Sequence, residues 1–166
     1  MNYPIYFDSK KSSHLFELND EFDFLKDLYI KNKLPNVLML SGQKGLGKST
    51  LINHLLFYIF DQNNYDVKNY NFDNKSSFYN QFLSNIFSNI IYLSGSDFKN
   101  IKIEDIRNLK SKILKTTILN KPRFIIFDDV ELFNNNSLNA LLKILEEPSK
   151  NNHFVLINNL SNPLID

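Results

Sequence analysis

The stretch VLMLSGQKGLGKST, from Val37 to Thr50, places four apolar residues directly before a cluster of glycines. Three of the chain's four glycines lie within Gly42–Gly47, and Lys48 and Ser49 follow them. The cluster fits the pattern G-x-x-x-x-G-K-[ST] at every fixed position. The apolar run before it suits a strand, and the leucines and isoleucines after it have the spacing of a buried helix face. This strand–loop–helix context is the one in which the pattern binds phosphate.

A phosphate loop gives each of these residue types a role. Glycines let backbone N–H groups approach phosphate oxygens, and the following helix adds its positive end. Lys48 would reach the β- and γ-phosphates, and the Ser49 hydroxyl would ligate Mg²⁺. An ordinary glycine-rich turn is the alternative, but such a turn requires neither the lysine nor the hydroxyl. We therefore expect nucleotide contacts along the whole loop, at Gly42, Gln43, Lys44, Gly45, Leu46, Gly47, Lys48, Ser49 and Thr50.

Three further apolar runs follow, at Ile90–Leu93, Phe124–Phe127 and Phe154–Ile157. Their continuous apolarity is typical of strands covered on both faces, as in a parallel sheet. Helical spacings lie before and between the four runs, at Phe22/Leu25/Tyr29, Leu51–Ile59, Phe78–Ile86, Ile106–Ile113 and Leu138–Leu145, the last stopped by Pro148. This alternation predicts an α/β fold with a parallel sheet flanked by helices. The polar, aperiodic segment 61–77 is expected to be a loop or insertion.

Composition narrows the classes of function. The 166 residues, 43% of them hydrophobic, are enough for one domain with a core, and a single domain over residues 1–166 is expected. A net charge of +1 gives no overall attraction to nucleic acid or membrane. Cysteine is absent, which excludes disulfide scaffolds, thiolate zinc sites and thiol catalysis. No apolar run approaches the ~18 residues of a membrane span, and no signal pattern begins the chain, so we expect a cytoplasmic protein.

Two acidic residues follow the third apolar run. The segment RFIIFDDVELF places Asp128 and Asp129 at the end of the expected strand. In phosphate-loop enzymes an acid at the tip of a neighbouring strand holds Mg²⁺, usually through water, and Asp128 has that position. Aspartates at strand ends are also common turn residues, so the assignment depends on the intact phosphate loop. The sequence predicts that Ser49 and Asp128 hold Mg²⁺.

Three segments, in order, resemble one family. NALLKILEEP at Asn139–Pro148 closely resembles a signature of bacterial clamp-loader subunits of the AAA+ ATPase class, the γ/τ and delta-prime subunits of DNA polymerase III. IKIEDIRNLK at Ile101–Lys110 is similar to the family segment that opens the helix after the second strand. NKLPNVLMLSGQKGLGKSTL at Asn32–Leu51 is similar to the delta-prime approach to the phosphate loop. Delta-prime is favoured because the four-cysteine zinc module and the N-terminal Arg-Pro and Gly-Gln motif usual in γ/τ are missing.

The resemblance implies a fold, cofactors and partners. The fold would be an AAA+ core, and the cofactors would be ATP and Mg²⁺. The chain would be part of a hetero-oligomeric ring that opens a sliding clamp and loads it on primed DNA, an accessory role to a DNA polymerase. The family pattern would continue beyond Asp166 into an arginine finger, a fifth core strand, a lid and a collar, so we expect a fragment or a truncated product.

The resemblance also implies roles for particular residues. Lys48 and Asp129 match catalytic positions. Asn158 and Asn159 match the region of a polar sensor that contacts the γ-phosphate or the attacking water. Lys102 and Lys143 match positions that contact DNA phosphates in related subunits; a solvated surface charge is the alternative for each lysine. The family's usual acid pair is Asp-Glu, whereas this chain has Asp-Asp, so the Asp129 carboxylate would be about 1 Å short of the usual reach.

Two rival functions stay open on the sequence. The chain could be a non-catalytic AAA+ scaffold in which the nucleotide is structural or absent. A phosphate-loop kinase is the other rival, but kinases of this type need arginines over the phosphates. The chain has two arginines, Arg107 and Arg123, and the NALLKILEEP segment also argues against a kinase.

Overall fold

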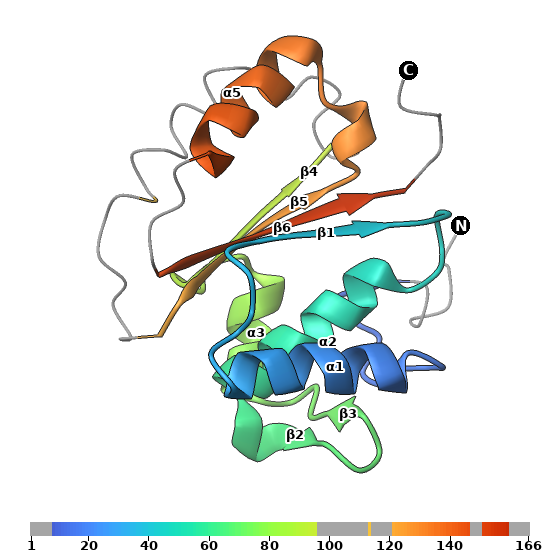
Figure 1. Ribbon diagram of the computed structural model, residues 1–166. Helices are drawn as coiled ribbons and strands as arrows, with labels where there is room; N and C mark the ends of the chain where they lie inside the picture. Colours follow the sequence, from blue (N-terminus) through green and yellow to red (C-terminus); the bar gives the residue numbers. More distant parts are fainter. Residues whose placement is uncertain (1–7, 96–112, 114–120, 147–150, 160–166) are drawn as a thin grey trace. The chain divides into compact units, whose positions relative to one another are not determined.

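The computed structural model describes residues 8–95, 113, 121–146 and 151–159 (Figure 1). The chain divides into two compact units. The helical unit comprises residues up to Leu34 together with Gly45–Phe87. The sheet unit comprises Pro35–Lys44 and the residues from Ser88 onward. The boundary falls within the glycine loop, so the two halves of that loop belong to different units.

In the described part of the sheet unit, four strands run parallel to one another. They are β1 (Val37–Ser41), β4 (Ile90–Ser94), β5 (Arg123–Asp128) and β6 (Asn152–Asn158), in the order β1-β6-β5-β4. All four apolar runs therefore form strands, and the expected α/β fold with a parallel sheet is confirmed. Since the strands run in the same direction, their carboxyl ends meet at one edge of the sheet. That edge carries the residues after Ser41, Ser94, Asp128 and Asn158.

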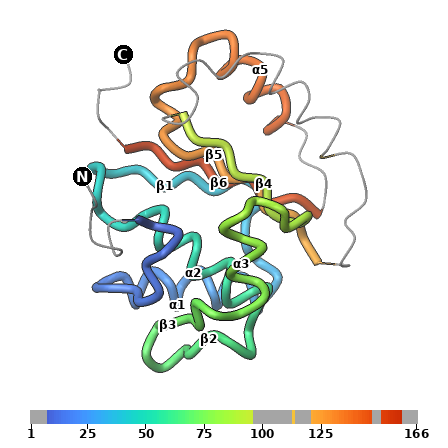
Figure 2. Tube along the Cα trace, turned by 180° about the vertical axis from the view of Figure 1, so that it is seen from behind, coloured from blue at the N-terminus to red at the C-terminus, as the bar shows by residue number. Residues whose placement is uncertain are grey.

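One helix of the sheet unit packs beside the sheet in both views (Figures 1 and 2). This helix, α5 (Asn135–Leu145), follows the short 3-10 helix η3 (Val130–Leu132), and Asn134 caps it by accepting a hydrogen bond from the Ser137 N–H. Leu141 is its main core residue and packs in a cluster with Ile125, Phe127 and Phe154. Leu142 was expected on the same apolar face, but it is 54% exposed, because the face that meets the core is centred on Leu141.

Continuous apolarity predicts burial correctly only for the central strands. Every apolar residue of β5 is buried, whereas Val37 and Met39 on β1 are 37% and 52% exposed. The expectation of two covered faces is therefore wrong for β1. The reason is topological, since β1 and β4 are the edge strands of the described sheet and each has one neighbouring strand there. The helix expected around Ile106–Ile113 lies outside the described residues except for Ile113, which is helical and buried.

The helical unit is built around a helix that is buried on all sides. It contains α1 (Asn19–Ile30), α2 (Lys48–Phe60) and α3 (Ser77–Leu83). The sequence predicted one buried face for α2, but all nine residues from Leu51 to Ile59 are buried, Asn53 and His54 included. Aromatic rings of the same unit account for part of this burial. Figure 1 shows α1 and α3 beside α2, and the ring of Phe57 stacks on that of Phe72 at 3.8 Å.

The segment 61–77 has more structure than expected. It contains the 3-10 helix η2 (Gln62–Asn64) and an antiparallel pair of two-residue strands, β2 (Tyr65–Asp66) and β3 (Asn71–Phe72). The expectation of a loop is wrong for this hairpin, because Tyr65 and Phe72 supply buried rings that hold it. Ser76 then caps α3 by accepting the Tyr79 N–H at 3.1 Å. Ile86, expected in that helix, lies beyond its end and is 70% exposed.

Candidate nucleotide and metal site

The glycine loop has the backbone that its sequence predicts. Gly45 and Gly47 have φ angles of +91° and +77°, in the left-handed region that favours glycine. A Cβ at Gly47 would lie 2.8 Å from Leu18 Cδ1, the end of a side chain that can shift, so conformation more than space favours glycine there. Gly47 is the N-cap of α2 and provides no side-chain cap for the first turn. A helix start of this kind, preceded by glycines, fits an anion such as a phosphate group.

The cation and the hydroxyls of the motif begin the buried helix. Lys48, Ser49 and Thr50 are the first three residues of α2 and are half-buried. The next nine residues of α2 are buried, so this helical turn has a rigid base. Earlier in the loop, Gln43 and Lys44 are exposed, and Leu46 is 58% exposed. The loop is therefore half-buried where it enters α2 and exposed at its earlier residues.

The predicted acids lie at the carboxyl edge of the sheet. Asp128 ends β5, and Asp129 follows it with a φ of +51°, a conformation that aspartate tolerates better than most residues. The Asp128 Oδ1 atom accepts the Asp129 N–H at 2.9 Å. Asn159 follows β6 and donates from Nδ2 to Asp129 Oδ1 at 2.7 Å and to Asp128 Oδ1 at 3.4 Å. The sheet thus brings Asn159 to the two acids, although it lies 31 positions after Asp128 and 30 after Asp129 in the chain.

Asp129 is the most enclosed member of this group. Its side chain accepts hydrogen bonds from Asn159 and, at 3.3 Å, from the Ser94 hydroxyl, and the residue is 5% exposed. Lys44 Nζ lies 3.5 Å from Asp129 Oδ1. The Lys44 side chain is 67% exposed, so solvent screening keeps this ion pair within about 1 kcal/mol. Asp129 is therefore held by its neighbours on the sheet more than by the lysine.

The second predicted asparagine has a different place. Asn158 is the last residue of β6, opposite Ser41 of β1, and its carbonyl accepts the Gly42 N–H at 3.2 Å. This bond continues the β1–β6 ladder into the glycine loop. The Asn159 N–H donates to Glu131 Oε2 at 3.1 Å, so Glu131 fixes the backbone directly after β6. Of the two asparagines, Asn159 is the one whose side chain contacts the acids.

Sequence reasoning missed the contribution of strand β4. The Tyr92 hydroxyl donates to Asp128 Oδ2 at 2.5 Å, and Ser94 donates to Asp129. Gly95, the one glycine outside the phosphate loop, lies so close to Asp129 that an added Cβ would be 2.4 Å from the Asp129 carbonyl oxygen. Two features of the sequence could have indicated this role of β4. One is the isolation of Gly95 in a glycine-poor chain, and the other is the polar residue Ser94 at the end of an otherwise apolar run.

The structure does not test the remaining predicted contacts. Gly45–Thr50 belong to the helical unit and Asp128 to the sheet unit, so a shared Mg²⁺ at Ser49 and Asp128 stays a prediction. Within the described residues, no group of three or more Asp, Glu, His or Cys side chains could itself hold a metal ion. The predicted set relies instead on phosphate oxygens and water, as Mg²⁺ sites at nucleotides do. Lys143 is exposed on α5, and Lys102 lies outside the described residues.

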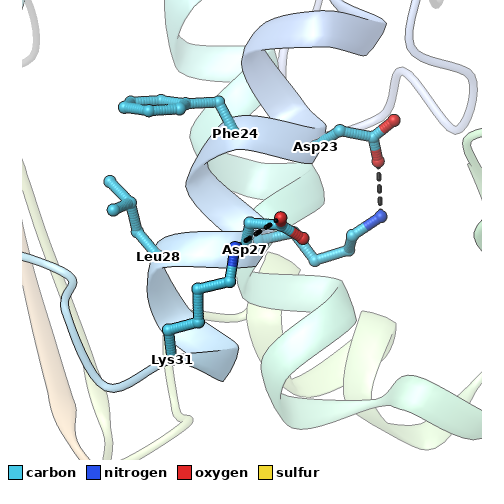
Figure 3. A pocket seen from close by; sticks show the side chains of 6 residues that line it. Asp23, Phe24, Asp27, Leu28 and Lys31 are labelled. Carbon is cyan, nitrogen blue, oxygen red and sulfur yellow. Dashed lines mark hydrogen bonds and ion pairs between the residues drawn. The ribbon is translucent and has the colours of Figure 1, made fainter.

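A pocket on α1 is a separate feature of the helical unit (Figure 3). Phe24 and Leu28 point to one side of the helix, and the Lys31–Asp27 pair at 3.1 Å lies next to them. Figure 3 also shows Asp23 on the other side, where it pairs with Lys26 at 2.5 Å. This pair lowers the pKa of Asp23. Such i,i+3 and i,i+4 pairs are ordinary features of a solvated helix surface.

Comparison with known proteins gives the family. A model of the family described as DNA polymerase III, delta subunit, matches residues 18–166. The chain belongs to this family. The resemblance to clamp-loader subunits that the sequence motifs indicated is thereby confirmed. Among the described residues, no helix has the length and apolarity needed to cross a membrane.

Two curated relatives and one solved structure agree with the family match. The chain is 25% identical over 138 residues to DNA polymerase III subunit delta' of Buchnera aphidicola subsp. Baizongia pistaciae (strain Bp), covering 81% of this chain and 41% of the relative. It is 26% identical over 124 residues to DNA polymerase III subunit gamma of Buchnera aphidicola subsp. Acyrthosiphon pisum (strain APS), covering 75% and 33%. The chain thus spans less than half the length of either relative.

The solved structure supports the fold. It is a DNA polymerase III gamma subunit-related protein from Thermotoga maritima, with a TM-score of 0.58 and 22% sequence identity. The match covers 84% of this chain and 39% of that one. At this identity the likeness concerns the fold alone, and it agrees with the expected α/β fold.

Proposed function

We propose that this subunit binds ATP and Mg²⁺ and works in the DNA polymerase III clamp loader, helping to load the sliding clamp on primed DNA. The observation that carries the proposal is the intact loop, with glycines at +91° and +77° and a glycine N-cap directly before Lys48. A chain that no longer bound nucleotide would have no need for this glycine-dependent backbone together with its lysine and hydroxyl. Such a subunit would act in the cytoplasm, within a hetero-oligomeric ring.

In this proposal, different residues contact the phosphates and the metal ion. The backbone N–H groups from Gly42 to Ser49 would surround the phosphates, and Lys48 would neutralise the β- and γ-phosphate charge. Bound Mg²⁺ would neutralise charge that develops on the phosphates. Ser49 and Asp128 would hold it. Asp129 and Asn159, joined at 2.7 Å, would orient the attacking water or contact the γ-phosphate.

Within the family we propose delta-prime rather than γ/τ. The delta' relative matches over more of this chain than the gamma relative does, 81% against 75%, at nearly the same identity. The interval between the glycine loop and β4 contains the aromatic hairpin of Tyr65 and Phe72 in place of a cysteine module. The absence of cysteine from the whole chain supports the same choice.

The alternative is a scaffold subunit in which the nucleotide is structural or absent. The Asp129 carboxylate favours the scaffold alternative, because it is short and buried and already accepts hydrogen bonds from Asn159 and Ser94. It is therefore poorly available to orient an attacking water. DNA contact is a further part of the proposal. Lys143, exposed on α5, and Lys102 would contact backbone phosphates without reading sequence.

Equilibrium binding of a fluorescent ATP analogue with Mg²⁺ tests the proposal. Lys48→Ala should weaken binding about 30-fold or more, since losing a charge-assisted hydrogen bond costs ~2 kcal/mol. The fold should persist, because Lys48 is in the first turn of α2 and outside the core. Lys31→Ala is the matched control, since it removes an exposed cation from the same unit and should leave binding unchanged. If the wild-type chain does not bind at millimolar nucleotide, ATP binding is wrong and the scaffold function remains.

A further inference from the structure

Tyr92 contacts the proposed metal carboxylate from the neighbouring strand. β4 and β5 are parallel, with Tyr92 opposite Ile126 and Ser94 opposite Asp128. Tyr92 and Ser94 are two positions apart, so their side chains leave the same face of the sheet. The two hydroxyls divide the acid pair between them, since Tyr92 donates to Asp128 and Ser94 to Asp129. One strand end therefore supplies a donor to each acid.

The Asp128 carboxylate is held through both of its oxygens. Oδ2 accepts the Tyr92 hydroxyl at 2.5 Å, and Oδ1 accepts the Asp129 N–H at 2.9 Å. Asn159 Nδ2 adds a longer contact to Oδ1 at 3.4 Å. A hydrogen bond from a neutral hydroxyl to a carboxylate is among the stronger protein hydrogen bonds. Donors on both oxygens fix the rotation of the carboxylate about its Cβ–Cγ bond, and the Tyr92 contact is the shortest of them.

We propose that Tyr92 is a positioning residue for the Mg²⁺–nucleotide complex. By holding Oδ2, its hydroxyl sets the orientation in which Asp128 meets Mg²⁺ or the water bound to it. The inference rests on the proposed function, because it requires nucleotide binding with Asp128 at the metal. Partners that orient a metal's carboxylate ligand from behind affect metal affinity by about 10–100-fold when removed. Since Asp128 is expected to act through water, the effect should lie at the lower end of this range.

Tyr92→Phe is the direct test, because it removes one oxygen and keeps the ring. Binding of a fluorescent ATP analogue to the 166-residue chain is measured at increasing Mg²⁺ and again in EDTA. The Mg²⁺ concentration for half-maximal binding should rise about 10-fold, while the affinity in EDTA stays unchanged. Tyr79→Phe in α3 is the matched control, since it removes a hydroxyl far along the chain from the acids and should leave both values unchanged. Melting temperatures check that each variant is folded.

A double-mutant cycle separates positioning from a merely structural role. If Tyr92 acts through Asp128, Tyr92→Phe should have no further effect on the Mg²⁺ requirement in an Asp128→Asn background. A structural role would give independent effects, visible in EDTA as well. The inference is overturned if Tyr92→Phe has the Mg²⁺ requirement of wild type, or if its effect persists undiminished beside Asp128→Asn.

The same experiment distinguishes this inference from the proposed function. If the wild-type chain binds the analogue in a Mg²⁺-dependent way and Tyr92→Phe behaves identically, only the role of Tyr92 is wrong. If the wild-type chain does not bind the analogue at millimolar concentration with Mg²⁺, the proposed function is wrong, and the inference is wrong with it.

Discussion

The two units hold different groups of the predicted site residues, and each unit builds its group in a different way. In the helical unit, Lys48, Ser49 and Thr50 are consecutive residues at the start of one buried helix. In the sheet unit, the acid group comes from three strand ends, with Tyr92 on β4, Asp128 on β5 and Asn159 after β6. The residues proposed to bind phosphate are thus adjacent in the sequence. The residues proposed for metal and water depend on strand register, so substitutions outside the proposed contacts can disturb them.

The largest expected effect concerns ATP hydrolysis, because Asp129 stands where clamp-loader subunits usually have a longer glutamate. The isolated chain should bind ATP and turn it over very slowly, because Asp129 is short, buried and already bonded to Asn159. Arg123 is buried in β5 and donates to the Ile113 carbonyl, so it does not act as an arginine finger. An arginine supplied by a neighbouring subunit is worth ~10³–10⁵ in rate. Asp129→Glu can restore at most the ~100-fold that a 1 Å misplacement costs.

A steady-state phosphate-release assay compares the lone chain, the Asp129→Glu variant and the assembly with partner subunits. Partner subunits should raise turnover more than Asp129→Glu does. A lone wild-type chain that turns over at ~1 s⁻¹ or faster, in the ordinary enzyme range, would show that the site needs no partner.

The next effect contrasts two glycines, one from each half of the site. Gly95→Ala should destabilise the fold by about 2–3 kcal/mol, because the new Cβ would meet the Asp129 carbonyl at 2.4 Å and overpack the strand end. For a chain of this length that lowers the melting temperature by about 6–9 °C. Gly45→Ala meets nothing within 4 Å, but its φ of +91° costs about 1–2 kcal/mol of backbone strain.

Two measurements on these variants sharpen the contrast. Melting temperature should fall more for Gly95→Ala, whereas binding of the ATP analogue in EDTA should fall more for Gly45→Ala. The reverse order in both measurements would contradict the division of the site into a phosphate half and an acid half.

Much of the fold could be predicted from the sequence, because the apolar runs that form strands are short and continuous. The errors have a common physical source. Exposure of Met39 depends on the position of β1 at the sheet edge, and burial of Tyr65 and Phe72 depends on rings elsewhere in the helical unit. None of these properties is contained in a window of neighbouring residues. Periodicity therefore gave the elements and missed the environment of particular side chains.

The candidate site divides along the same line. The glycine loop could be predicted because its pattern is contiguous, and Asp128 because a strand end is visible in the sequence. Tyr92 and Gly95 could not, since their roles arise only when β4 and β5 pair with Ser94 opposite Asp128. A one-residue change of that register would turn Tyr92 to the opposite face of the sheet and away from the acid. The isolated glycine was a visible clue, but its need for space comes from the backbone of Asp129.

The last expected effect concerns stability at low pH, and His54 is its cause. This side chain is buried in α2. Its Nε2 atom lies 3.0 Å from the Ser12 carbonyl oxygen, and its Nδ1 atom lies 3.0 Å from the Tyr65 hydroxyl oxygen. A carbonyl can only accept, so Nε2 donates and Nδ1 accepts the Tyr65 hydroxyl. Burial lowers the pKa of His54 from 6.5 to about 4; the bond to Ser12 opposes this shift, and the nearby His14 adds to it.

The sign of the pH dependence follows from proton counts. Between pH 6.5 and about 4 the unfolded chain binds a proton at His54 that the folded chain does not, so the free energy of unfolding falls as the pH is lowered through this range. From pH 7.5 to pH 5 the free energy of unfolding should fall by about 2 kcal/mol. This value follows because pH 5 lies ~1.5 units below the unfolded-state pKa of 6.5, and each unit contributes about 1.36 kcal/mol. Urea unfolding at the two pH values measures it. His54→Gln should abolish this part of the pH dependence, while His153→Gln in the sheet unit should keep it, because His54 is untouched there. Equal losses in the wild-type chain and His54→Gln would mean that carboxylates, and not the buried histidine, control acid stability.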